Sequence, residues 1–144
     1  MSLYFEKLRV EHILEITLQP QQESLQAQLT PEYAHSIVGH TGIGWAALLH
    51  GKTIACAGIL EFWANRGQGW ALFSEAALAN FTAIHRFTRG VLREQPFARV
   101  EIFVDQHHAA AIRWAERLGF EREGLMRRFT TDGRDCFLYA KVDP

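Results

Sequence analysis

The chain has 144 residues, the size of one ordinary domain, so we expect a single domain over residues 1–144. Its residues are 48% hydrophobic, and 15 Lys and Arg oppose 16 Asp and Glu, which gives a net charge of −1. This composition is typical of a globular protein and excludes intrinsic disorder. A net charge so close to zero gives no support to a nucleic-acid partner.

Cysteine content and apolar runs exclude further classes of protein. Cys56 and Cys136 allow at most one disulfide, so a cysteine-stapled secreted scaffold is excluded and a cytoplasmic location is favoured. Each is expected to be a small buried residue. The first seven residues include charges where a signal peptide needs an apolar run, and no apolar stretch approaches the ~20 residues of a membrane span. His107 and His108 point apart at the start of a helix and have no partners at i+4, so no metal site is expected.

The first half of the chain predicts four strands and two helices. Thr30 and Pro31 are typical of a helix start, because a hydroxyl caps the helix and proline favours its first position. Gly51-Lys52 predicts a tight turn between two strands, and the Gly-rich run 65–69 predicts a turn before the next one. Polar residues 19–24 form a connection or a helical turn. The predicted elements are strands 3–10, 45–50, 53–63 and 70–74, helix 11–16, and the helix that begins near residue 30.

The second half alternates helices and strands. Residues 76–94 have helical spacing, with Arg86, Arg89 and Arg93 opposite the apolar face and Gly90 unfavourable by ~1 kcal/mol relative to Ala. Strand 99–104 leads to a second helix, which Gly119 ends in a left-handed conformation. Strands 121–129 and 136–142 enclose the turn 130–134. The order predicts an α+β fold, with a mixed, mostly antiparallel sheet of six to seven strands and about four flanking helices.

Residues 100–124 contain the most specific pattern. A strand and a short turn lead to a helix that begins with alanines, continues with Ala-Ile and ends in Glu-Arg-Leu-Gly-Phe. This segment resembles the late part of the GCN5-related N-acetyltransferases (GNATs), and the three strands before the long helix follow the order of that family. The resemblance implies the GNAT fold. It also implies direct transfer of an acetyl group from the co-substrate acetyl-CoA to a primary amine, without a covalent enzyme intermediate.

The resemblance also implies where acetyl-CoA binds. In the family the pantetheine arm enters between two splayed parallel strands, here 70–74 and 99–104, and hydrogen-bonds their backbone as an added strand would. The pyrophosphate lies on backbone amides at the start of the helix that follows the first of these strands. The cofactor-binding positions implied in this way are Phe73, Ser74, Glu75, Ala76, Ala77, His108 and Ala111.

Three features depart from the family pattern. The usual Arg/Gln-x-x-Gly-x-Gly/Ala loop is replaced by residues 74–80, which contain no glycine, and Glu75 adds a negative charge near the expected phosphates. Ala115 replaces the tyrosine that often returns a proton to the departing thiolate. His108 stands where the family has an asparagine. Imidazole titrates near neutrality, so His108 could replace the function of either residue, or it could simply begin a helix in solvent.

The transfer also needs a general base for the attacking amine. Glu61 and Glu75 are the candidates. Glu61 lies between Leu60 and Phe62 and is expected to project from the opposite face, toward the cleft, although a solvated strand carboxylate is the plainer interpretation. The acceptor is a small-molecule or peptide amine, chosen by the Gln-rich region 19–43, which has few acids and so does not favour a polycationic amine.

A second resemblance supplies a rival function. The run Trp-Ala-Leu-Phe-Ser-Glu before an Arg-bearing helix, and the later Asp-Gly-Arg-Asp-Cys-Phe-Leu-Tyr, are similar to acetyltransferase-fold proteins of tailed phages and prophages. This similarity implies a GNAT-fold protein that has lost turnover and acts through protein–protein contacts in virion assembly, associated with the virion. The glycine-free loop and Ala115 favour this alternative. A homodimer is open under either function, because dimers are common in this fold.

Overall fold

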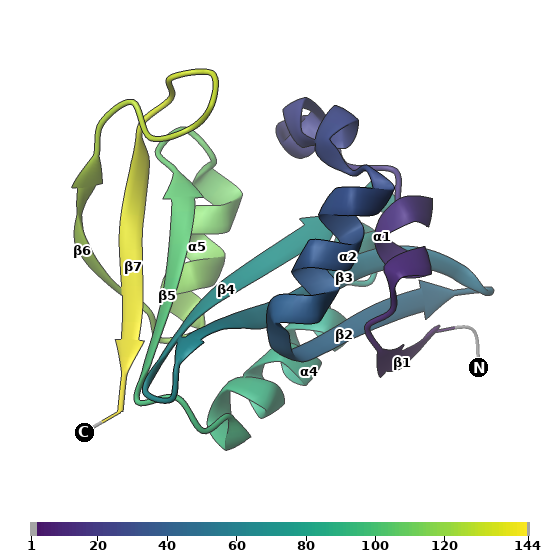
Figure 1. Ribbon diagram of the computed structural model, residues 1–144, viewed down its shortest axis with the longest axis horizontal. Helices are drawn as coiled ribbons and strands as arrows, with labels where there is room; N and C mark the ends of the chain where they lie inside the picture. The colour runs from purple at the N-terminus through teal and green to yellow at the C-terminus, as the bar shows by residue number, and fades with distance from the viewer. Residues whose placement is uncertain (1–2, 144) are drawn as a thin grey trace. The chain divides into compact units, whose positions relative to one another are not determined.

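The computed structural model describes residues 3–143, which form seven strands, five α-helices and one 3₁₀ helix. The strands are β1 (Leu3–Lys7), β2 (Thr41–Leu49), β3 (Lys52–Trp63), β4 (Arg66–Phe73), β5 (Arg99–Asp105), β6 (Glu121–Met126) and β7 (Cys136–Val142). The helices are α1 (Val10–Glu15), η1 (Pro20–Gln28, the 3₁₀ helix), α2 (Pro31–His40), α3 (Glu75–Ala79), α4 (Phe81–Glu94) and α5 (Ala109–Arg117). The hydrogen-bonded strand order is β1-β2-β3-β4-β5-β7-β6, and β4 and β5 are parallel. The expected α+β class with a mostly antiparallel sheet is confirmed (Figure 1).

Several elements differ from their predicted bounds, and three of the differences have a local cause. The glycine-containing run predicted as a turn lies mostly within β4, where Gly67 pairs with Val100 of β5. The long helix predicted over 76–94 is interrupted at Asn80, whose side chain donates to the Ala76 carbonyl at 2.9 Å; a short polar side chain that bonds the backbone competes with helix continuation. Strand β6 ends at Met126, because Arg128 takes a left-handed conformation with φ +50°.

The residues gather into two compact units. The first unit contains Met1–Glu61 and Gly69–Gln95, and the second contains Phe62–Gln68 and Pro96–Pro144. Strand β4 contributes to both, since its residues 66–68 form the parallel ladder with β5 inside the second unit. That residues 1–144 act as one domain stays a prediction.

In the first unit, helices cover both faces of the strands. One cluster buries Leu8, Ile13 and Ile16 with Cys56 of β3 and Leu72 of β4, on the side of α1 and α2. Helix α2 begins as predicted, because the Tyr33 amide donates to the Thr30 hydroxyl at 3.2 Å. On the opposite face, Phe87 of α4 stacks on Phe5 of β1 at 4.1 Å between ring centroids.

In the second unit, α5 packs beside β5, which pairs with β7, and β7 pairs with β6 (Figure 1). Gly119 ends the segment after α5 with φ +96°, as predicted. Glu101 of β5 is only 4% exposed. Its carboxylate accepts from the Arg66 Nε at 2.6 Å and from the Arg99 Nε at 2.7 Å, which compensates its burial.

Candidate functional site

The junction of β4 and α3 contains five of the predicted cofactor-binding residues, all in the first unit. Phe73, Ser74 and Ala77 are buried, Ala76 is partly buried, and Glu75 is exposed. The Ser74 amide donates to the Ile54 carbonyl of β3 at 2.9 Å, and the Ser74 carbonyl accepts from the Ala77 amide at 3.2 Å. These bonds fix the backbone where the strand becomes a helix.

The Ser74 side chain is the anomaly of this junction. The residue is 8% exposed, and its Oγ has no hydrogen-bond partner among the described residues. A buried polar atom without a partner is unfavourable by about 1–3 kcal/mol, so such atoms in native proteins call for a ligand, a water or a functional reason. A polar ligand group would satisfy the hydroxyl but would reach it only after a local movement of the junction, because less than 1 Å² of the Oγ is accessible. In this respect the residues present fit a phosphate- or amide-bearing cofactor.

The break at Asn80 creates a second helix start that the sequence prediction missed. Helix α4 begins at Phe81 and has no acidic residue in its first turn, unlike α3, where Glu75 occupies the first position. The first amides of a helix lack intrahelical acceptors and attract negative charge. Asn80 was the available signal, because asparagine is typical of helix boundaries.

The edge of β4 that points away from β3 is occupied by polar groups of the segment around η1. The Gln22 side chain donates to the Ala71 carbonyl at 2.9 Å and accepts from the Phe73 amide at 2.8 Å. The Gln19 amide donates to the Phe73 carbonyl at 2.8 Å. No local pattern indicated these contacts, because Gln22 and Phe73 are 51 positions apart.

Glu61, the predicted base on β3, is exposed. The structure gives its carboxylate no hydrogen bond or ion pair with another described residue, and its Oε1 lies 3.8 Å from the position that a Cβ would take at Gly42. This environment agrees with a solvated strand carboxylate. Its role as a base stays a prediction.

His108 and Ala111 lie in the second unit, where α5 begins. The His108 amide donates to the Asp105 carbonyl at 3.0 Å, and the His108 carbonyl accepts from the Ile112 amide at 3.0 Å, so the residue caps the helix through its backbone. Partial burial lowers the pKa of His108, and the nearby Asp105 charge opposes this shift only in part. The neutral imidazole is therefore favoured at physiological pH, which suits a proton acceptor better than a donor.

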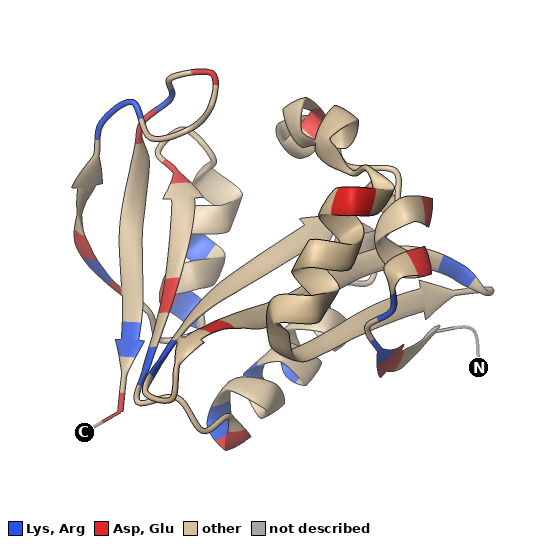
Figure 2. Cartoon of the chain, viewed as in Figure 1, with Lys and Arg blue, Asp and Glu red and all other residues tan. Residues whose placement is uncertain are grey.

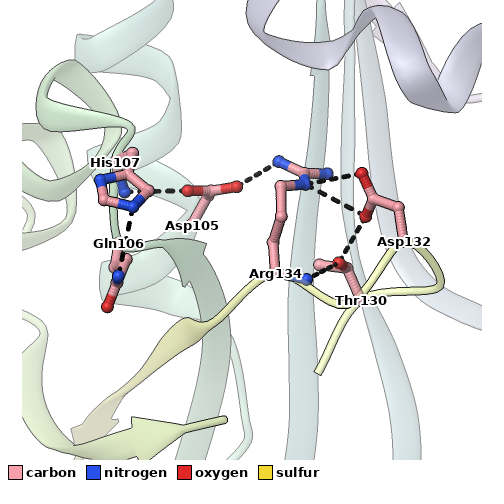
Figure 3. A network of polar contacts seen from close by, with 6 residues as sticks. All are labelled: Asp105, Gln106, His107, Thr130, Asp132 and Arg134. Carbon is pink, nitrogen blue, oxygen red and sulfur yellow. Dashed lines mark hydrogen bonds and ion pairs between the residues drawn. The ribbon is translucent and has the colours of Figure 1, made fainter. Parts of the chain in front are cut away.

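A polar network joins the end of β5 to the turn before β7 (Figure 3). One Asp105 oxygen accepts from the His107 amide at 2.8 Å, and the other pairs with Arg134. Arg134 also donates to Asp132 at 2.9 Å. The turn that presents His108 is thus tied to the turn 130–134 inside the same unit.

The tyrosine position of the family and the two cysteines offer no free reactive group. Ala115 is buried, and the buried Tyr139 of β7 cannot supply a free phenol in its place, since its hydroxyl donates to Glu116 at 2.8 Å and accepts from Arg122 at 3.0 Å. Cys56 and Cys136 are free and buried, as predicted, and burial raises the pKa of Cys56 to about 12, which disfavours a thiolate nucleophile.

Two classes of feature are absent from the described part of the chain. Among residues 3–143, no group of three or more His, Cys, Asp or Glu could hold a metal ion. Within the same range, no helix is long and apolar enough to cross a membrane.

Solved structures of acetyltransferases share this fold. Ard1 from Thermoplasma volcanium superposes with a TM-score of 0.81 at 13% identity, over 100% of this chain and 99% of its own. A GNAT-family acetyltransferase from Streptococcus pneumoniae gives 0.69 at 15% identity, over 99% of both chains. A ribosomal-protein alanine N-acetyltransferase from Escherichia coli gives 0.70 at 17% identity, over 99% of this chain and 95% of that one.

These similarities define the class of fold. The chain has the fold of the GNAT acetyltransferases, as the pattern in residues 100–124 implied. One further similar structure, the ribosomal-protein acetyltransferase RimL, was solved in complex with coenzyme A, at a TM-score of 0.69 and 12% identity. No family model and no curated protein matches the sequence.

Proposed function

We propose that the protein is an acetyl-CoA-dependent N-acetyltransferase that acts on a primary amine of a small molecule or peptide. The observation that carries this proposal is the buried, unpartnered Ser74 hydroxyl at the β4–α3 junction of a GNAT fold. The similar structures support it, because they are acetyltransferases and one of them holds coenzyme A. The two free, buried cysteines support a reducing compartment, the cytoplasm.

In this proposal, one group of residues binds the cofactor and another accepts a proton. Ser74 and the backbone of the junction hold the polar part of the cofactor, with Phe73, Glu75, Ala76 and Ala77 beside it. Cofactor contacts of His108 and Ala111, in the second unit, are those that the family resemblance implies. Acetyl-CoA, when bound, supplies an acetyl group activated as a thioester. The neutral imidazole of His108 accepts the proton of the attacking amine, and Glu61 is the alternative base.

Calorimetric titration with acetyl-CoA tests this function, with free coenzyme A as the reference ligand. We expect one-to-one binding in the micromolar range. Ser74→Ala should weaken binding about tenfold, since a lost hydrogen bond to a ligand is worth roughly 1–1.5 kcal/mol. The matched control is Ser36→Ala, because Ser36 is exposed on α2, and its affinity should not change.

The stability of the unliganded Ser74→Ala protein provides a second control, because the hydroxyl makes no hydrogen bond that the substitution could remove. Its urea midpoint should not fall. The Gln22 side chain occupies the edge of β4, so the titration is repeated with Gln22→Ala. Affinity no tighter than millimolar in both the wild type and this variant would contradict the proposed function.

A second candidate is a GNAT-fold protein without turnover that binds a protein partner, as in phage assembly. One observation favours it: Phe62 and Trp63 at the β3–β4 turn are 44% and 57% exposed. The Arg66 guanidinium lies 4.7 Å from the Phe62 ring and 4.9 Å from the Trp63 ring. Exposed Trp and Arg are enriched at the centres of protein interfaces. Alanine at Phe62 and Trp63 should leave acetyl-CoA affinity intact under either function, and should abolish partner binding only under this one.

A further inference from the structure

The edge of β4 that points away from β3 presents, in the first unit, backbone N–H and C=O groups that can hydrogen-bond an amide. The Ser74 amide bonds to Ile54 of β3, and successive residues of a strand present their backbone groups to opposite edges. Ala71 and Phe73 are odd-numbered neighbours of Ser74, so their N–H and C=O groups point away from β3. An extended ligand with an amide group could pair there as an added strand does.

The Gln22 carboxamide takes this place. Its nitrogen donates to the Ala71 carbonyl at 2.9 Å, and its oxygen accepts from the Phe73 amide at 2.8 Å. A residue of a parallel neighbouring strand makes this same pair of bonds, donating to one residue and accepting from the residue two further on. The side chain of Gln22 therefore makes the two hydrogen bonds that a residue of an added parallel strand would make with β4. The backbone amide of Gln19 adds a third, to the Phe73 carbonyl at 2.8 Å.

The segment that presents Gln22 is held mainly by such polar contacts. None of the nine residues of η1 (Pro20–Gln28) is buried. The Gln26 side chain accepts from the Leu18 amide at 2.7 Å and donates to the Ile16 carbonyl at 3.0 Å, while Leu25 is partly buried against the core cluster. Segments with few buried apolar contacts open locally at low free energy. Withdrawal of Gln22 from β4 does not require global unfolding.

We infer that Gln22 is an internal competitor of the cofactor, and that η1 is a strap which closes the edge of β4 until a ligand displaces it. This inference rests on the proposed function. The arm of acetyl-CoA carries two amide groups, which can form with Ala71 and Phe73 the bonds that Gln22 forms in the closed state. Binding then proceeds only from the open state, so the observed affinity is reduced by the fraction of molecules that are open.

The first experiment compares acetyl-CoA affinities by calorimetry in four proteins, the wild type and three variants. Gln22→Ala removes the competitor, and we expect its affinity to be about tenfold higher than that of the wild type, as the loss of two neutral hydrogen bonds from the closed state allows. Gln21→Ala is the matched control, because Gln21 is exposed on the same segment, and its affinity should equal that of the wild type. Gln22→Leu keeps a side chain of similar size but can neither donate to the Ala71 carbonyl nor accept from the Phe73 amide, so it should also bind more tightly, and it provides a second variant if Gln22→Ala folds poorly.

The second experiment follows the strap directly by ¹⁵N NMR of the wild-type protein. At saturation with acetyl-CoA, the side-chain amide protons of Gln22 should exchange with water at the rate of a free glutamine, whereas the backbone amide of Phe73 should stay protected because the ligand replaces its partner. Equal micromolar affinity of all four proteins, or weaker binding by Gln22→Ala, overturns the strap and leaves the proposed function standing. Absence of binding in every variant overturns both.

Discussion

His108 illustrates how a single position in the fold can change the chemistry that a family pattern implies. The residue stands at an asparagine position of the family, and its backbone caps α5. Partial burial lowers its pKa, which leaves the ring neutral and able to accept a proton. The tyrosine position, Ala115, offers no donor, and the hydroxyl of Tyr139 is already bonded. At the scale of the residue, the second unit is thus better equipped for removing a proton than for returning one.

The proposal that His108 is the general base predicts how kcat/KM depends on pH. The active form of His108 is the unprotonated one, so kcat/KM should rise with pH through a pKa below the ordinary value of 6.5. His108→Asn should remove this acidic limb and slow the reaction about 100-fold or more, within the usual range for a general base. His107→Asn is the matched control, because His107 is exposed. An unchanged acidic limb in His108→Asn would assign the base to another group, Glu61 first.

Residue positions were predictable where the signal was local. The strand and helix patterns, together with the family resemblance, placed Ser74 and His108 at the starts of helices, and the structure has them there. The contacts that give them their chemistry were not predictable. Gln22 reaches β4 across 49 and 51 positions, and Glu101 finds Arg66 across 35, so no pattern within one element could indicate them.

At the scale of the element, α4 combines a well-packed face with an unfavourable outer one. Its inner face buries Ile84 and Leu92 and stacks Phe87 on Phe5. Arg86, Arg89 and Arg93 are exposed at helical spacing, and the ion pairs of the described residues include none of them. Figure 2 shows Lys and Arg in blue along the ribbon of this helix. Like charges three and four positions apart destabilise a helix by a few tenths of a kcal/mol. Tertiary packing therefore holds this helix.

Gly90 is the clearest weakness of α4 that one substitution can repair. A Cβ added there would meet no atom within 4 Å, and its φ is not positive. Gly90→Ala should therefore stabilise the protein by up to about 1 kcal/mol, which is roughly 3 °C in Tm for a chain of this length. Thermal and urea unfolding measure the change.

The same substitution at Gly51 serves as the contrast. Gly51 also has open space, but its φ is +78°, so Gly51→Ala should destabilise the turn between β2 and β3. A fall in Tm for Gly90→Ala would show that the helix needs the glycine.

Element types were easier to predict than element limits. The Thr30 cap and the Gly119 end were visible because each depends on one or two neighbouring residues. The interruption at Asn80 was hidden by helical spacing that continues on both sides of it. Gly67 and Gly69 suggested a turn, yet β4 begins before them, because pairing with β5 outweighs the weak strand propensity of glycine.

At the scale of the whole molecule, several carboxylates are hydrogen-bonded to charged or polar side chains. Hydrogen bonds lower the pKa of four of them, each from a different partner: Glu6 from His12, Glu101 from Arg66, Glu123 from Arg99 and Asp132 from Thr130. A group whose pKa is lower in the folded state binds fewer protons there than in the unfolded chain.

The stability of the protein should therefore decrease in acid. The contribution of these groups is complete above the unfolded-state values of 4.5 for Glu and 3.8 for Asp, and it is lost as the pH falls through the lower folded-state values. Urea unfolding at pH 7, 5, 4 and 3 should show its steepest decline in free energy below about pH 5, after a smaller decline at higher pH from His108, whose pKa is also lower in the folded protein. Glu101→Gln should flatten the decline, since it removes the most buried of the four. An unfolding free energy that is independent of pH between 6 and 3 would contradict this account.

Strand β6 forms one end of the strand order, so one of its edges has no neighbouring strand in the described chain. An open edge is where separate molecules join into aggregates. This strand begins with Glu121, Arg122 and Glu123, and its register with β7 is shifted between Arg122 and Gly124. Charges and a bulge on an edge both hinder the addition of another strand. We therefore expect the charges and the bulge of β6 to prevent molecules in a concentrated solution from pairing through the open edge of this strand.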